Sequence, residues 1–121
     1  MTDVGDYHDA IAVPIPAGET GLSGEVEIRR FSLFAVSVPA GWITATAITF
    51  QASPTSGGTF LNVYDDAGNE VSVTVAASHA VSLDSVALKL APFRYIKIRS
   101  GTAASPVNQT NGPTLTLIAK G

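Results

Sequence analysis

Short runs in which apolar and polar residues alternate, separated by turn-forming segments, are the feature that most constrains this chain. In the clearest run, PFRYIKIRSG, isoleucines 96 and 98 alternate with Tyr95, Lys97 and Arg99. In a β-strand, side chains two residues apart share one face, so the isoleucines face a core and the other three face away from it. No long window has the periodicity of a helix. The pattern predicts an all-β domain, either a sandwich or a barrel.

Three further segments have the composition of strands. Residues 42–53 (WITATAITFQAS) are β-branched, aromatic and uncharged, which suits a central strand buried on both faces. Residues 59–75 (TFLNVYDDAGNEVSVTV) predict a hairpin, because two β-rich runs flank a loop at 65–69 that tolerates positive φ. Its second run is expected to place three valines in the core: Val71, Val73 and Val75. Residues 80–88 predict a short strand over 80–83, then a loop or a single helical turn.

The segment EVEIRRFSLFAVSV changes phase in its middle. Val26 and Ile28 are the apolar positions of its first half, whereas Phe34 begins a row that is out of step with them. The shift at Arg29 and Arg30 predicts a bulge or a bend between two strands.

The N-terminal residues are rich in glycine, proline and acidic residues. We predict an extended arm over 1–23 and one β-sandwich domain over 24–121, since 121 residues suffice for a single core. For the apolar run 10–15 two interpretations stay open: an edge strand, where prolines are tolerated, or a tail that orders on a partner. The acidic start lacks the basic residues and the apolar run of a signal peptide, so export by that route is not expected.

Charge and cysteine content limit the classes of function. The formal net charge of −3 argues against a protein that holds nucleic acid by its overall field. Charged residues make up only 14% of the chain, so small polar and apolar residues cover much of its surface, and such a surface often meets another surface. The chain contains no cysteine, which suits synthesis in a cytoplasm. No apolar stretch approaches the length of a membrane span, so no membrane partner is predicted.

Reactive groups show no catalytic pattern. Asp65, Asp66, Asn69 and Glu70 lie close together, but their spacing does not match a calcium loop, and acidic residues before a glycine are common in turns. The two histidines, at 8 and 79, lie far apart in the chain. Neither a nucleophile elbow nor a phosphate-binding glycine loop occurs. We therefore predict a non-enzymatic protein with no catalytic residue, no cofactor and no metal.

Basic and aromatic residues offer a candidate surface for a partner: Tyr95, Lys97, Arg99, Arg29, Arg30 and Trp42. If the arginines before residue 31 lie near the 95–99 strand, the cluster can pair with an acidic partner surface. If they do not, these side chains lie on the solvent-exposed face of a sheet. For Trp42 we expect a place in the core, whereas an exposed Trp42 beside Tyr95 would form a platform for a sugar ring.

Several short motifs resemble those of small β-sandwich proteins encoded in tailed-bacteriophage genomes. They are FQAS at 50–53, GGT at 57–59, DDAG at 65–68 and RYIKIRS at 94–100. The last is also similar to a late strand of discoidin-like, galactose-binding jelly rolls, whose usual disulfide is absent here. The resemblance covers roughly residues 42–120. It implies an antiparallel, jelly-roll-like β-sandwich of about eight strands.

The same resemblance implies a function. We expect a structural virion protein on the outer capsid surface, a decoration or cement protein that binds the major capsid protein and stabilises the shell. A homotrimer at local threefold positions, with residues 3–24 strapped across a neighbour and the Tyr95, Lys97 and Arg99 face in contact, is the expected arrangement. The alternative is a carbohydrate-binding module, or a tail or head-fibre module, for adsorption to the host.

Overall fold

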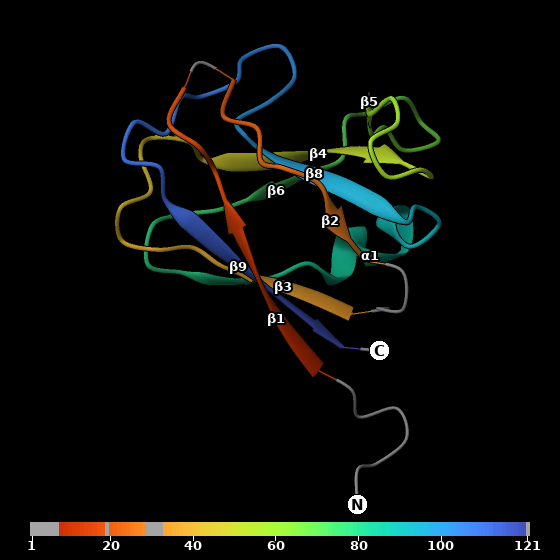
Figure 1. Ribbon diagram of the computed structural model, residues 1–121, viewed down its shortest axis with the longest axis horizontal. Helices are drawn as coiled ribbons and strands as arrows, with labels where there is room; N and C mark the ends of the chain where they lie inside the picture. Colours follow the sequence, from red (N-terminus) through yellow and green to blue (C-terminus); the bar gives the residue numbers. More distant parts are fainter. Residues whose placement is uncertain (1–7, 19, 29–32, 121) are drawn as a thin grey trace, which may run out of the picture.

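A computed structural model describes residues 8–18, 20–28 and 33–120 of the chain. In this part of the chain, strands form two antiparallel sheets, one above the other, accompanied by one short helix (Figure 1). The elements are β1 (His8–Pro14), β2 (Val26–Glu27), β3 (Leu33–Ser37), β4 (Ala47–Ser53), β5 (Leu61–Asn62), β6 (Ser72–Thr74), β7 (Ala80–Ser82), α1 (Asp84–Leu90), β8 (Tyr95–Ser100) and β9 (Thr114–Lys120).

The strand order is that of a jelly-roll-like wrapping. One sheet has the order β1-β9-β3-β7, and the other has the order β2-β8-β4-β5, with β6 also pairing with β4. The pairs are nested, because β1 pairs with β9, β2 with β8, β3 with β7, and β4 with β5 and β6. Successive pairs alternate between the two sheets, as in a long hairpin rolled into a double-sheet sandwich. The predicted fold class is confirmed, with nine strands in the described residues.

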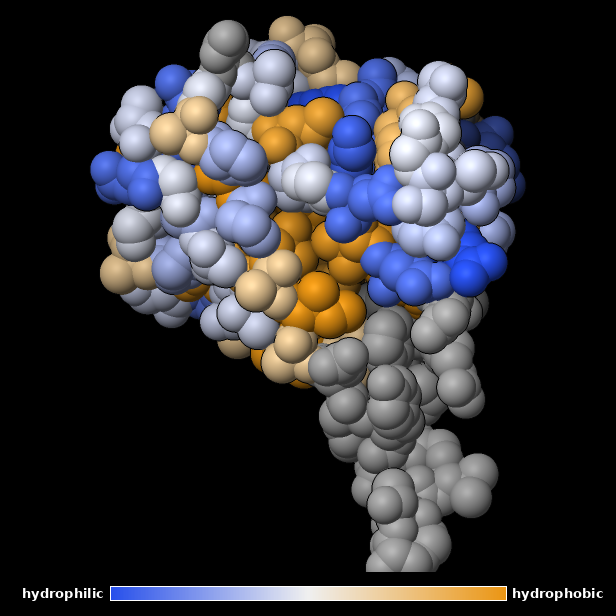
Figure 2. Space-filling view, viewed as in Figure 1, coloured by the Kyte–Doolittle hydropathy of each residue, from blue (hydrophilic) through white to orange (hydrophobic). Residues whose placement is uncertain are grey.

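The core lies between the two sheets, and alternate residues of the longer strands, such as Ile96 and Ile98 of β8 and Leu115 and Leu117 of β9, face it. Figure 2 shows apolar side chains in the middle of the molecule, between the positions that the sheets occupy in Figure 1. Burying each large aliphatic or aromatic side chain contributes about 1.5–3 kcal/mol. The largest fully buried apolar side chains include Phe50, Ile48, Ile96, Ile98, Leu115 and Leu117, and the three predicted valines at 71, 73 and 75 are also buried.

The central strand is shorter than the predicted segment 42–53, because it begins at Ala47, after Thr44 with its positive φ of 45°. β4 pairs with β8 on one side and with β5 and β6 on the other, and most of its residues are buried. β2 belongs to the five-stranded sheet and β3 to the four-stranded sheet, so the chain crosses between layers where the apolar row changes phase. The predicted bend at Arg29 and Arg30 itself lies outside the described residues.

The segment 59–75 has the expected turn but a different pairing from that of a simple hairpin. Asp65 N–H donates to Asn69 O at 2.8 Å, and a single bridge joins Tyr64 and Glu70. β5 and β6 do not pair with each other. Both pair with β4 on the same side, so the turn connects two short strands that follow one another along that edge of β4. The predicted hairpin is confirmed next to its turn, where Val71 N–H also donates to Val63 O at 3.0 Å, but further from the turn both runs pair with β4 instead of with each other.

Part of the predicted arm belongs to the folded domain. β1 is an edge strand that pairs with β9 along its whole length, and Val13 within it is buried. Further along, Ser23 N–H donates to Ile98 O, and Ser23 Oγ accepts the Ile98 N–H, both at 2.9 Å. Of the two interpretations left open by the sequence, the structure shows the edge strand. The prediction for residues 1–7 lies outside the described residues.

The weakly patterned segment before β8 forms a strand and a short helix. β7 pairs with β3, and α1 follows after Leu83, which is fully buried. The predicted strand and helical turn are both present, and the helix extends to Leu90. The loop 91–94 after α1 leads into β8 and borders the groove described below.

Candidate interaction surfaces

The predicted basic face lies on the outside of the five-stranded sheet. Tyr95, Lys97 and Arg99 share the outer face of β8, because Ile96 and Ile98 between them are buried in the core. The three outward side chains differ in exposure. Tyr95 and Lys97 are half-buried, and Arg99 is buried.

Tyr95 and Lys97 contact neighbours within the chain. Lys97 Nζ lies 4.6 Å from the centroid of the Phe60 ring, and the Arg94 guanidinium lies 5.5 Å from the centroid of the Tyr95 ring. Arg94 Nε also donates to Glu27 at 2.9 Å, and this hydrogen bond raises the pKa of Arg94. These contacts hold the cations against the sheet.

Arg99 is the centre of a buried polar network and is only 6% exposed. Its Nη2 donates to Asn62 Oδ1 at 2.6 Å, and its Nη1 donates to Thr49 Oγ1 and to Glu70 Oε2, each at 3.3 Å. The Thr49 hydroxyl donates onward to Gly101 O at 2.8 Å. Arg99 therefore ties β8 to β4 and β5 and to Glu70 at the end of the acidic turn.

Acidic side chains balance the cations of this outer face. Glu25 accepts hydrogen bonds from the Ser56 hydroxyl and from the Gly57 N–H. The bond from Ser56, then the bond from Gly57, lower the pKa of Glu25, and Lys97 adds a smaller Coulombic contribution. The face is a mixed-charge surface whose described charges lie beside opposite charges. It is not an open basic strip.

Two other candidates have separate positions. Trp42 is 7% exposed, and its Nε1 donates to Ala45 O at 2.8 Å, so the expected place in the core is confirmed. A buried Trp42 cannot form a sugar platform with Tyr95. Arg29 and Arg30 lie outside the described residues, and their proximity to β8 stays a prediction.

The acidic turn forms a closed loop. Asp65 Oδ1 accepts the N–H groups of Ala67 and Asn69, each at 2.9 Å. The bond from Asn69 is the main cause that lowers the pKa of Asp65. Glu70 faces Arg99, away from a shared site with Asp65. Among the residues that the structure describes, no three acidic or histidine side chains gather in a way that could hold a metal ion.

Two complete rows of uncharged side chains cross the four strands of the four-stranded sheet on its outer face. One row consists of Ala10, Ile118, Ala35 and Ser82, and the next consists of Ala12, Thr116, Ser37 and Ala80. Ile118 is the large apolar side chain in these rows and is 40% exposed. Sequence reasoning missed this face, because its residues come from four distant segments, although each segment shows small residues at alternate positions.

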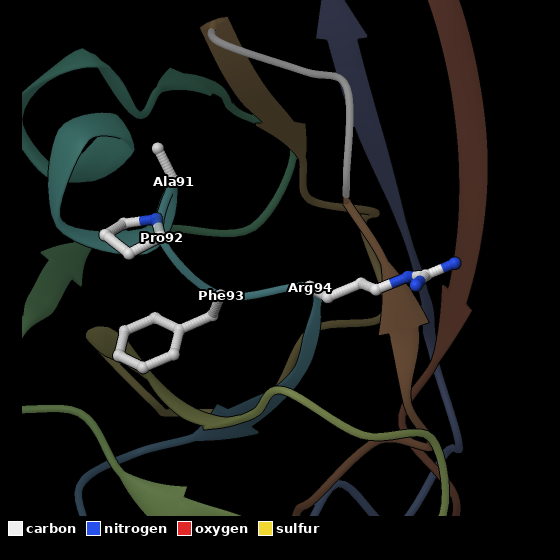
Figure 3. Close-up of a pocket in the computed structure, with 4 residues that line it drawn as sticks. All are labelled: Ala91, Pro92, Phe93 and Arg94. Carbon is white, nitrogen blue, oxygen red and sulfur yellow. The ribbon is translucent and has the colours of Figure 1, made fainter.

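A groove beside Phe93, which we call the Phe93 groove, was also not predicted. It joins an apolar hollow of about 370 Å³ to a hollow of about 390 Å³ with a charged wall. A further hollow of about 400 Å³ is lined by the loop residues 91–94 themselves. In Figure 3 the Phe93 ring and the Arg94 side chain point away from each other. The apolar part of the groove is lined by Ala52, Pro54, Leu61, Val63, Tyr64 and Phe93, and the charged wall by Asp65, Asp66 and Lys89.

Comparison with known proteins supports the fold. The chain matches no protein-family model and no curated protein. Among solved structures, the SPBc2 prophage-derived protein YomS is similar, with a TM-score of 0.54 and 14% sequence identity, over 99% of this chain and 100% of that one. At this identity the likeness concerns the fold. Within the described residues, no helix is long and apolar enough to cross a membrane.

Proposed function

We propose that this chain is a capsid decoration protein of a tailed bacteriophage, which docks on the major capsid protein through the outer face of its four-stranded sheet. The observation that carries the proposal is the pair of uncharged rows of small side chains across that face. The short motifs shared with phage-encoded β-sandwich proteins, and the fold shared with a prophage-derived protein, support the phage setting. The protein would then lie on the outer surface of the virion and act without catalysis.

Small, uncharged side chains lower the free-energy cost of burying this face in an interface. Interface cores are depleted in charged residues, because each charge must lose its hydration. Alanine has no rotamer freedom to lose on docking, and serine and threonine have little. A single contact of this kind contributes little binding free energy. Repeated over a symmetric shell, many such contacts sum into resistance to disassembly.

The N-terminal strap that we propose is shorter than the segment 3–24 expected from the sequence. β1 pairs along its length with β9, and residues 21–23 bond to β8, so this part of the expected strap holds the domain together. We therefore propose the strap for residues 1–7 alone. Deleting 1–23 would remove an edge strand and is unsuitable as a test, whereas deleting 1–7 leaves β1 in place.

The test is co-sedimentation with capsids of the phage that encodes the chain, prepared without this protein. Thr116→Lys places a charge between Ala12 and Ser37 on the proposed face. Thr74→Lys is the matched control, because Thr74 is exposed on a strand of the other sheet. We expect Thr116→Lys to weaken capsid binding at least about tenfold, since the new charge must be desolvated. We expect the control to bind as the wild type does.

Two results would overturn the proposal. One is equal binding by both lysine variants, which would move the contact off the four-stranded sheet. The other is no binding by the wild type to intact capsids, which would favour a tail or head-fibre position. The sugar platform of Trp42 and Tyr95, which the carbohydrate-binding alternative required, is ruled out by the burial of Trp42.

A further inference from the structure

The Phe93 groove contains the two most exposed large apolar side chains of the described residues. Leu61 is 68% exposed and Tyr64 is 54% exposed, the two highest values among the large apolar side chains described. Both line the groove together with Phe93. Leu61 pairs with Ala52, whose side chain belongs to the core. The groove therefore lies where the core-facing side of the five-stranded sheet extends past the residues that bury it. Apolar surface gathered in a hollow is typical of a binding site.

The groove runs beside an open strand edge. β5 pairs with β4 on one side and lies at the end of its sheet. Val63 N–H donates to Phe50 O, and residues of an antiparallel ladder alternate in the direction of their backbone groups, so the N–H and C=O of Asn62 face away from β4. An extended segment can add to such an edge and place alternate side chains in a neighbouring hollow.

The walls of the groove are fixed by hydrogen bonds. Asn62 Oδ1 accepts from Arg99 and from Gln51 Nε2, which anchors β5 from the outer face. Asp65 Oδ1 holds the turn through two backbone N–H groups. Because these walls are already ordered, a ligand would lose little free energy in shaping them.

The charged wall favours a cation. Lys89 lies close enough to Asp65 to act on it through space, as a lesser effect than the turn's own hydrogen bonds. Asp66 is exposed and makes no ion pair within the described part of the chain. A positive side chain is therefore the charge that complements this end of the groove.

We propose that the Phe93 groove binds an extended segment of a partner protein, which lies beside β5, places an aliphatic side chain in the apolar part of the groove and directs a lysine or arginine two residues later toward Asp66. Side chains two residues apart in an extended segment lie on the same face, about 7 Å apart. The site is separate from the uncharged face of the four-stranded sheet. It stands or falls independently of capsid docking through that face.

The proposal is tested with short synthetic peptides and nuclear magnetic resonance on the full chain. The probe is acetyl-Thr-Leu-Thr-Lys-Thr-amide, and its matched controls replace Leu by Ser or Lys by Glu. We expect the probe to shift the backbone amide signals of residues 60–66 and 93. The Ser peptide should bind at least about tenfold more weakly, because it buries no apolar side chain. The Glu peptide should bind about threefold to fivefold more weakly, a difference that shrinks in 1 M salt.

Variants of the chain locate the site. Leu61→Ser should weaken binding of the probe at least about tenfold, and Asp66→Asn should remove the preference for Lys over Glu. Ile118→Ser is the matched control, since it removes an exposed aliphatic side chain from the other sheet and should leave binding unchanged. Absence of shifts at millimolar probe, or shifts elsewhere on the chain, would overturn the proposal. Shifts of the same signals by maltose but not by the probe would show a sugar site in its place.

Discussion

Replacing Arg99 by methionine tests whether the buried network stabilises the fold. The variant loses three hydrogen bonds and leaves the Glu70 carboxylate with only the N–H of Ala103, at 3.1 Å. Breaking a buried ion pair costs about 3–5 kcal/mol. The Arg99 side chain is 7% exposed and that of Glu70 is 19% exposed, so water partly screens the carboxylate. We therefore expect the lower end of the range, a loss of about 3 kcal/mol.

The measurement is urea unfolding, followed by the fluorescence of the single tryptophan, Trp42. With a denaturant slope of about 1.5 kcal/mol per molar urea, the midpoint should fall by about 2 M. Lys97→Met on the same strand face is the matched control, because Lys97 is only half-buried and contacts a ring. It should cost less than about 1 kcal/mol. A loss of less than about 1 kcal/mol for Arg99→Met as well would refute the assignment of Arg99 as a buried, paired cation.

A double-mutant cycle separates the pair from simple packing. We combine Arg99→Met with Glu70→Gln and compare the double variant with the two single variants. The combined loss should be smaller than the sum of the single losses by about 1 kcal/mol or more, because either change alone already breaks the pair. Additive losses would mean that the two side chains stabilise the fold through separate contacts.

Three further outcomes are expected. Gly101→Ala should lower the free energy of unfolding by about 2–4 kcal/mol, because φ is +89° and a Cβ would lie 2.6 Å from the backbone carbonyl oxygen of Ser105. Gly68→Ala, at a φ of +87° with open space around it, should lower it by only about 1 kcal/mol in the same urea assay. Iodide should quench Trp42 fluorescence several-fold less in the folded chain than in 8 M urea, and equal quenching would contradict its burial. Since the N–H of Asn69 lowers the pKa of Asp65, this carboxylate contributes stability that is fully present above its unfolded pKa near 4 and is lost as pH falls through the lower folded pKa. Asp65→Asn should flatten the stability curve below about pH 4, and an unchanged curve would show that the turn bonds do not hold a carboxylate.

The strand faces were predictable because alternation in an extended backbone is local. Ile96 and Ile98 face the core, and the valines of the second run after the acidic turn do so as well. The acidic turn was predictable for the same reason, since Asp65 and Asn69 close it within five residues. The burial of Trp42 followed from its place at the start of a strand-rich, uncharged segment.

The candidate surfaces were much less predictable. Arg99 looked like a solvent-exposed cation on a polar face, but Glu70 and Asn62 from a distant segment cover it. The Phe93 groove needs a loop after the helix to meet β5 and the acidic turn. The uncharged face needs four strands in the correct register. Each of these depends on contacts between residues far apart in the chain, for which a sequence pattern holds no signal.

The sequence by itself determined the class of the fold, the inward and outward sides of its main strands, the position of its acidic turn and the lack of any thiol chemistry. These properties follow from the two-residue period of an extended chain and from composition. Only the tertiary structure decided that β5 and β6 share one partner, that residues 8–14 complete a sheet, and that two rows of uncharged side chains align across one outer face while Arg99 and its partners gather on the other. Strand pairing is chosen by packing and loop closure across the whole domain, so one strand's neighbours cannot be read from its own residues.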